Sequence, residues 1–223
     1  MITHTIDHCP LIFFPSRTEH APLVLVHTVG DEAPALYDAL CSIATVPFHL
    51  ACLAPHHWND DLSPWPAQVE LGEENAFSGY ALDQLAFLEE RLLPFLAVAL
   101  PAYDDIILAG YSMAGLFALY APYQSSAFDK IVSCSGSLWY PDFADYVCSH
   151  AFAKAPKSIY LSLGDREGRT RHPLMSQVNA KTEAIYTHYQ ALGLPIIFEW
   201  NAGGHFKNPV ARLARGIAWS LGH

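Results

Sequence analysis

The pattern with the clearest chemical meaning is Gly110-Tyr111-Ser112-Met113-Ala114, which lies between two apolar segments. A strand that turns sharply into a helix exposes a serine hydroxyl above a sheet, provided that small residues stand two positions before and two after the serine. Gly110 meets the first condition, and Ala114 meets the second with one methyl group more than the usual glycine. The pattern predicts Ser112 as a nucleophile. The alternative is an ordinary strand–helix turn that happens to contain a serine.

A serine nucleophile needs a general base, and His205 fits this role best. It comes a few residues after the apolar run Ile196–Trp200 and directly after Gly203 and Gly204, which allow the backbone to bend sharply. His188 falls inside a predicted helix, while His150 and His172 do not directly follow a predicted strand. His205 is therefore the predicted base, with a loop histidine that only caps the last helix as the alternative.

The carboxylate that orients the base should follow the apolar run Ile159–Leu163. In hydrolases whose serine lies at such a strand–helix turn, the order along the chain is serine, acid, histidine. Asp165 and Glu167 both lie there, two positions apart, so they cannot both face one imidazole. Hydrolases of this fold often carry the acid three residues after a glycine, which here selects Glu167 after Gly164. Glu167 is the preferred acid and Asp165 the alternative, and the other carboxylate would pair with a nearby arginine.

An oxyanion hole requires two backbone N–H groups aimed at the developing negative charge. The residue after the nucleophile, Met113, supplies one of them at the start of a predicted helix. The second should come from the loop after Leu23–His27, where we select Val29, with Thr28 as its alternative.

Short apolar runs alternate with longer helical patterns along the chain, which predicts a mostly parallel sheet with helices on both faces. We expect one α/β domain over residues 1–223, without a large lid domain, and Leu11–Phe14 as an antiparallel edge strand. The predicted central strands are Leu23–His27, Phe48–Leu53, Ile106–Ala109, Ile131–Cys134, Ile159–Leu163 and Ile196–Trp200. The predicted helices are Pro34–Ala44, Tyr80–Leu100, Met113–Tyr120, Pro173–Leu192 and Pro209–Leu221.

The segment Pro55–Glu74 has little periodicity and contains Trp58 and Trp65, so we expect a long irregular loop. The two tryptophans either fix this loop to the core or form a wall that faces a substrate. With Phe77 and Trp139 they suggest an aromatic substrate pocket.

Composition excludes several classes of partner. Lysine and arginine total 12 against 22 acidic residues, which gives a formal charge of −10 and no basic patch for nucleic acid or an anionic membrane. The apolar run Ile106–Tyr123 carries glycine and serine at its centre, which favours a buried strand and helix over a membrane span. Five scattered cysteines and the lack of a signal peptide favour a soluble, cytoplasmic protein. We expect no metal site, because the adjacent His56 and His57 point apart.

Four blocks of sequence resemble the Putative esterase family of the α/β-hydrolases, which includes enterochelin esterase and relatives of esterase D. They are GYSMAG (110–115), SGSLWYP (135–141), LSLGDRE (161–167) and GGHF (203–206), with a further likeness in WNDDLSPWPA (58–67). The resemblance implies Ser112 as nucleophile, Glu167 as acid and His205 as base. It also places Trp139 beside the acyl pocket. Alanine at position 114 and a glutamate as the acid depart from the family pattern.

The expected activity is that of a serine carboxylesterase that cleaves a small soluble ester through an acyl-enzyme, without a cofactor. A peptidase or thioesterase could use the same triad, and a non-catalytic binding protein could keep the same fold. The sequence does not predict the natural substrate. It does not predict the oligomeric state either, and a homo-oligomer is compatible with it.

Overall fold

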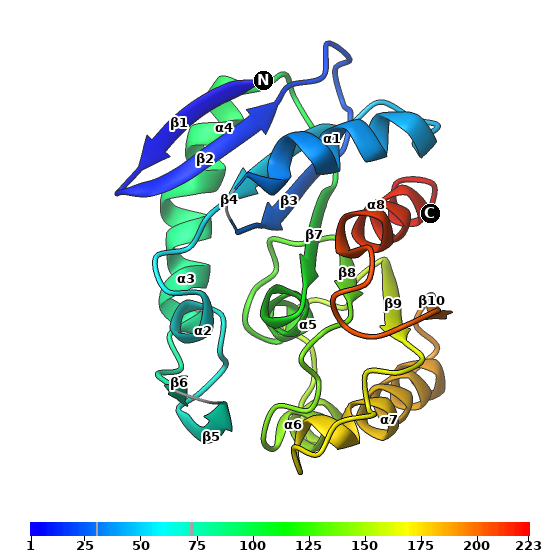
Figure 1. The fold of residues 1–223 in the computed structure, drawn as a ribbon. Coiled ribbons are helices and arrows are strands. Elements are labelled where there is room, and N and C mark those ends of the chain that lie inside the picture. Colours follow the sequence, from blue (N-terminus) through cyan, green and yellow to red (C-terminus); the bar gives the residue numbers. More distant parts are fainter. Residues whose placement is uncertain (30, 72–73) are drawn as a thin grey trace.

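A sheet of eight strands forms the centre of the computed structural model, which describes residues 1–29, 31–71 and 74–223 (Figure 1). The strand order is β1-β2-β4-β3-β7-β8-β9-β10, and the six strands from β4 to β10 in this order are parallel. The strands are β1 (Ile2–Ile6), β2 (Cys9–Phe14), β3 (Leu23–His27), β4 (His49–Leu53), β7 (Ile106–Tyr111), β8 (Lys130–Cys134), β9 (Ser158–Gly164) and β10 (Ile196–Asn201). The predicted mostly parallel sheet is confirmed.

Continuous apolar sequence marks the strands that are buried on both faces. β3, β4, β8 and β9 are buried along their whole length, as a parallel sheet between two helical layers requires. β10 lies at one edge of the sheet, and most of its residues are only partly buried or exposed. The carboxyl ends of β3, β7, β9 and β10 lie at the same edge of the sheet, so the loops that follow them converge there.

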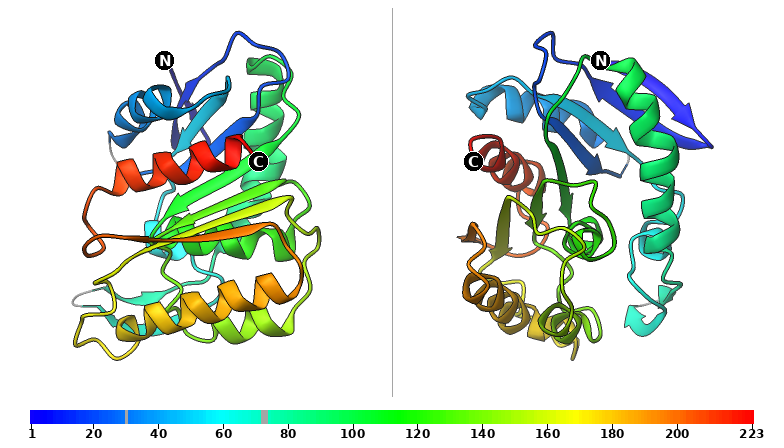
Figure 2. Two further views of the ribbon diagram at one scale, coloured as in Figure 1. Left: turned by 90° about the vertical axis from the view of Figure 1, so that its right-hand side faces the viewer. Right: turned by 180° about the vertical axis from the view of Figure 1, so that it is seen from behind.

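Helices cover both faces of the sheet (Figure 2). α1 (Glu32–Ile43) and α8 (Pro209–Leu221) pack on one face, where their apolar side chains form a core with Val24, Ile107 and Val132. The other face is covered by α3 (Ala81–Phe87) and α4 (Leu93–Ala99), joined by the π-helical turn Leu88–Leu92, and by α5 (Met113–Gln124), α6 (Phe143–Ser149) and α7 (Val178–Ala191), the last preceded by a short 3-10 turn at Met175–Gln177. No large lid domain covers the sheet in the part of the chain that is described.

Two expectations about the amino-terminal third were wrong. Leu11–Phe14 is antiparallel, but it is not an edge strand, because β1 pairs with its outer side through a tight turn at Asp7 and His8. β1 escaped notice because its residues are mostly polar and all but Ile6 are exposed. Backbone hydrogen bonds to β2 hold β1 in the sheet. Such bonds do not depend on side-chain type, so the sequence contains no apolar pattern that would predict this strand.

The segment Pro55–Glu74 is also more regular than expected. It contains the short helix α2 (Trp58–Asp61) and the strand β5 (Ala67–Leu71), which pairs with β6 (Glu74–Phe77) in a separate two-stranded sheet. Residues 72 and 73 of this segment lie outside the described residues. Elements of four or five residues are too short to show a period. The helix α6, with seven residues, was not predicted either, because two turns contain few apolar repeats.

None of the helices in the described ranges has both the length and the hydropathy that a membrane span requires.

Candidate active site

Ser112 lies at the tight turn between β7 and α5, in the strained backbone conformation φ 60°, ψ −122°. The turn brings the backbone of Ala114 so close to Gly110 that a Cβ atom at position 110 would lie 2.1 Å from the Ala114 carbonyl oxygen. Only glycine fits at position 110, whereas the methyl group of Ala114 is accommodated in a buried site. The turn therefore forms despite the departure at position 114.

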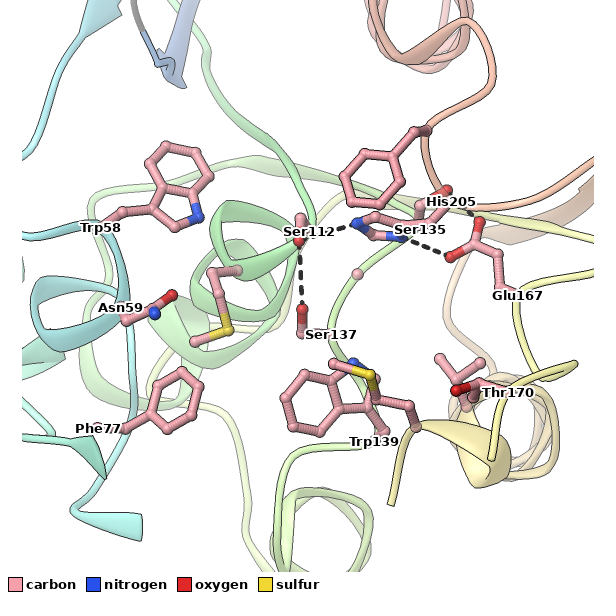
Figure 3. Close-up of a pocket in the computed structure, with 15 residues that line it drawn as sticks. Trp58, Asn59, Phe77, Ser112, Ser135, Ser137, Trp139, Glu167, Thr170 and His205 are labelled. Atoms are coloured by element: carbon pink, nitrogen blue, oxygen red, sulfur yellow. Dashed lines mark hydrogen bonds and ion pairs between the residues drawn. The ribbon is translucent and has the colours of Figure 1, made fainter. Parts of the chain in front are cut away.

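His205 lies in the loop between β10 and α8, and its imidazole faces Ser112 (Figure 3). The distance from His205 Nε2 to Ser112 Oγ is 3.1 Å. The hydroxyl of Tyr111 donates a hydrogen bond to the backbone carbonyl of His205, which ties the loop to the end of β7. Gly203, at φ +106°, supplies the sharp bend of this loop that the sequence suggested.

Glu167 completes the hydrogen-bonded chain. Its Oε2 lies 2.7 Å from His205 Nδ1, so Nδ1 carries the proton and Nε2 is left as the acceptor that faces Ser112. Its Oε1 accepts hydrogen bonds from the Ser135 hydroxyl and the Gly164 N–H, each at 2.7 Å. Burial by itself would raise the pKa of Glu167, but the hydrogen bonds from His205, Ser135 and Gly164 outweigh burial and lower the pKa below its ordinary value.

Asp165, the alternative acid, does not reach the imidazole. Its Oδ1 accepts a hydrogen bond from the backbone N–H of Gly203 at 2.7 Å, and its side chain is 53% exposed. The weak contact with Arg166, 3.9 Å between Nε and Oδ1, is the arginine pairing that we expected for the second carboxylate. Asp165 thus joins the acid loop to the histidine loop, and Glu167 alone of the two contacts His205.

Arg212 supports this arrangement from behind, and no pattern in the sequence indicated this role. Its guanidinium is buried under the site, and Nη1 lies 3.2 Å from both the Ser135 and the Tyr111 hydroxyl oxygens and 3.3 Å from Glu167 Oε1. Nη2 donates to the Ala202 carbonyl at 3.1 Å. One side chain from α8 therefore contacts residues of three loops, and no local pattern in α8 predicts those partners.

Ser137 is a second residue that sequence reasoning missed, although it lies in one of the blocks that carry the family resemblance. Its N–H donates to the Ser112 carbonyl at 3.0 Å, and its hydroxyl oxygen lies 3.4 Å from Ser112 Oγ (Figure 3). A substrate bound to Ser112 would therefore meet the Ser137 hydroxyl.

Of the two expected oxyanion donors, Met113 is the first residue of α5, where N–H groups have no partner inside the helix. The N–H of Thr28 donates to the Leu53 carbonyl at 3.0 Å and is thus already engaged. The N–H of Val29 faces the carboxylate of Glu32 at 3.5 Å, the long limit of a hydrogen bond. Val29 is accordingly the better donor of the two. Gly30 of the same loop lies outside the described residues.

Two cavities meet at Ser112 and His205, and we name them the aromatic cavity and the Glu32 cavity. The aromatic cavity has a volume of about 340 Å³ and the Glu32 cavity one of about 250 Å³. Besides Ser112 and His205, they share Trp58 and Phe206. The aromatic cavity is also lined by Asn59, Phe77, Met113, Ser135, Gly136, Ser137, Trp139, Glu167, Thr170, Met175 and Val178. The Glu32 cavity is also lined by His27, Thr28, Val29, Glu32, Leu36, Tyr111, Pro209, Val210 and Leu213.

The three tryptophans that we expected to bind substrate divide into two groups. Trp58 lines both cavities and Trp139 lines the aromatic cavity, and in Figure 3 Trp58 lies to the left of Ser112 and Trp139 below it. Trp65 does not line either cavity, and this expectation was wrong. Its ring packs against Tyr120, Tyr140, Phe143 and Tyr146, and its Nε1 donates to the Pro141 carbonyl at 3.2 Å. Trp65 therefore holds the segment after α2 on the core.

In the described ranges, no three histidine, cysteine, aspartate or glutamate side chains are grouped closely enough to hold a metal ion.

Residues 56–192 match the family described as "Putative esterase", and this match covers more than half of the chain. The chain belongs to the Putative esterase family. The fold is the α/β-hydrolase fold, and the expected enzyme class, a serine esterase, is that of the family.

Solved structures of similar fold include two hydrolases. The siderophore hydrolase EstA from Aspergillus nidulans superimposes with a TM-score of 0.74 at 19% identity, over 96% of this chain and 89% of EstA. An IroE-like serine hydrolase from Shewanella oneidensis superimposes with a TM-score of 0.77 at 17% identity, over 95% of this chain and 75% of that chain. By sequence, the protein YbbA from Bacillus subtilis (strain 168) is 24% identical over 181 residues, which is 76% of this chain and 72% of YbbA. At such identities the structural likeness establishes the fold alone.

Proposed function

We propose that the protein hydrolyses small soluble carboxylic esters by way of a covalent acyl-enzyme on Ser112. The observation that carries the proposal is the hydrogen-bonded chain from Ser112 Oγ through the His205 imidazole to the Glu167 carboxylate, with steps of 3.1 and 2.7 Å. A nucleophile, a base and an orienting acid in this order constitute the machinery of acyl transfer. The position of Ser112 between two cavities leaves room for both halves of an ester.

In the first half of the reaction, Ser112 Oγ bonds to the ester carbonyl carbon as its proton passes to His205 Nε2. The tetrahedral oxyanion accepts hydrogen bonds from the N–H groups of Met113 and Val29. The C–O bond to the alcohol then breaks, and His205 gives its proton to the leaving oxygen. Glu167 holds the imidazole in the required tautomer and stabilises its charged form.

In the second half, water attacks the acyl carbon and transfers a proton to His205, which returns it to Ser112 as the acid is released. Atoms balance over the two halves: one ester and one water give one acid and one alcohol. Each step uses side chains and backbone groups of this chain, so the proposal includes no cofactor.

The aromatic cavity is lined by four aromatic rings, which favour a neutral apolar group there: Trp58, Phe77, Trp139 and Phe206. EstA is named a siderophore hydrolase, so esters of that class belong in the first panel of substrates. We place the reaction in the cytoplasm, a proposal supported by five cysteines that are all free thiols.

The experiment that tests the proposal is labelling with a fluorophosphonate, followed by intact mass and peptide mapping. We expect a single adduct on Ser112 that the Ser112→Ala variant lacks and the Ser137→Ala variant retains. Ser112→Ala should also lower kcat for p-nitrophenyl acetate by about four orders of magnitude or more. Absence of an adduct on folded protein would favour the non-catalytic binding protein. Faster turnover of thioesters or aminoacyl amides than of matched esters would favour the thioesterase or peptidase.

A further inference from the structure

Among the described residues, the Glu32 cavity is lined by one carboxylate and by no lysine or arginine that could balance its charge. Glu32 is the first residue of α1 and is half-buried where it lines the cavity beside Ser112 and His205. Neither cavity is lined by a lysine or an arginine among the described residues. The other carboxylate at the site, Glu167, is already bound by His205, Ser135 and the Gly164 N–H.

His27 does not balance the charge of Glu32 either. Its side chain is buried at the end of β3, and its Nε2 lies 2.9 Å from the Gln84 amide nitrogen. Burial lowers the pKa of His27 to about 3, so its ring is neutral at physiological pH. In the described part of the chain, Glu32 makes no ion pair.

The position of Glu32 also matters for the proposed reaction. Its Oε2 lies 3.5 Å from the N–H of Val29, one of the proposed oxyanion donors. A carboxylate so close to the donor opposes the negative charge that develops in the transition state, unless a cation stands beside it. A positively charged group on the substrate would pair with Glu32 and remove this opposition.

We propose that Glu32 selects esters whose alcohol half carries a positive charge, such as a quaternary or primary ammonium group. The inference depends on the proposed esterase function. The neutral acyl half then occupies the aromatic cavity, beside Trp139, and the cationic alcohol half occupies the Glu32 cavity. Trp58, which lines both cavities, offers an aromatic face at the boundary to such a cation. The formal charge of −10 also favours the approach of cationic over anionic substrates.

The test compares benzoylcholine with neohexyl benzoate, in which a quaternary carbon replaces the quaternary nitrogen at nearly the same size. We expect wild-type kcat/KM to be about fivefold higher for benzoylcholine, as for a partly exposed ion pair with an aromatic neighbour. In Glu32→Gln this ratio should fall to about one. Asp31→Asn is the matched control, because Asp31 is the neighbouring acid, is exposed and lines neither cavity. It should keep the wild-type ratio.

Each other outcome has a definite meaning. If Glu32 only shapes the Val29 loop or the start of α1, Glu32→Gln changes both rates equally and the ratio remains, which overturns the inference. A similar drop of the ratio in Asp31→Asn would assign the preference to net charge and overturn it as well. Fluorophosphonate labelling of Ser112 without cleavage of benzoylcholine refutes the substrate class but leaves the nucleophile. Failure to label Ser112 refutes the proposed function itself.

Discussion

Arg212 and Glu167 form a buried ion pair behind the candidate site, with 3.3 Å between Nη1 and Oε1 and only 4% of either side chain exposed. Arg212 contacts Oε1 of Glu167, whereas His205 contacts Oε2. Both carboxylate oxygens of Glu167 therefore have partners. Arg212 also bonds to Ser135, Tyr111 and the Ala202 carbonyl, which satisfies most of its donors inside the protein. Removal of the guanidinium would take a donor from the Ala202 carbonyl and the buried countercharge from Glu167, which would keep its hydrogen bonds from His205, Ser135 and the Gly164 N–H.

We expect Arg212→Met to lower the free energy of unfolding by about 3 kcal/mol, because Glu167 loses its buried countercharge and the buried Ser135 hydroxyl loses a donor. Arg215→Met on the same helix is the matched control. Arg215 pairs with Glu199 at 2.6 Å, but its side chain is 53% exposed, and its loss should cost less than about 1 kcal/mol. Urea unfolding of the three proteins measures both values. Equal losses for the two variants would show that burial of Arg212 adds nothing to its contribution.

The two carboxylates of the acid loop should differ sharply in kinetics. Glu167→Gln removes the charge that orients His205, and we expect kcat to fall by about three to four orders of magnitude. Asp165→Asn weakens the hydrogen bond to the Gly203 N–H but leaves the imidazole contact, so a loss of about tenfold or less is expected. Hydrolysis of p-nitrophenyl acetate measures both. A loss in Asp165→Asn as large as in Glu167→Gln would transfer the role of the acid to Asp165.

Most of the sheet and the identity of the three triad candidates could be predicted from the sequence. The parallel strands were found because burial on both faces demands unbroken apolar runs, which few other elements have. Ser112 was found because the tight turn needs a small residue at position 110, a requirement that the steric contact with Ala114 bears out. Apolar runs and the small residue at position 110 are local features, so they can be recognised in the sequence without knowledge of distant contacts.

The remaining features depend on contacts between distant segments. The spacing after Gly164 favoured Glu167 over Asp165, but the hydrogen bonds that separate the two carboxylates, to the Gly164 and Gly203 N–H groups, follow from how two loops meet. In the sequence, Arg212 is one charged residue of an amphipathic helix. Its partners lie in loops far from it along the chain. Trp58 and Trp65 lie seven positions apart in one segment, yet α2 and the turn after it send one to the cavities and the other to the core.

The buried His27 should make stability depend on pH in the acid range. The pKa of His27 is about 3 in the folded protein and near 6.5 in the unfolded chain. Above about pH 6.5 the ring is neutral in both states, so it does not lower the free energy of unfolding there. As pH falls from 6.5 toward 3, the unfolded chain binds a proton that the native state does not. The free energy of unfolding should fall by about 1.4 kcal/mol per pH unit from this group.

The comparison of His27→Gln with wild type isolates this effect. Urea unfolding at several pH values between 4 and 7 should give a shallower pH dependence for the variant. The exposed His57, replaced in the same way, controls for the loss of a histidine as such. Parallel curves for wild type and His27→Gln would mean that His27 accepts its proton without unfolding.

Trp139 and Trp65 should respond to alanine substitution in opposite ways. Trp139 lines the aromatic cavity, so Trp139→Ala should raise KM for p-nitrophenyl benzoate about tenfold while it affects p-nitrophenyl acetate far less, since the small acyl group does not need the ring. Trp65 lies in an aromatic cluster away from both cavities, so Trp65→Ala should leave KM for both esters near the wild-type value. It should instead lower the free energy of unfolding by about 2 kcal/mol, because a large, partly buried ring is removed from an aromatic cluster. Steady-state kinetics and urea unfolding of the two variants decide the matter. A selective rise of KM for the benzoate in Trp65→Ala, or none in Trp139→Ala, would show that the aromatic cavity is not where the acyl group binds.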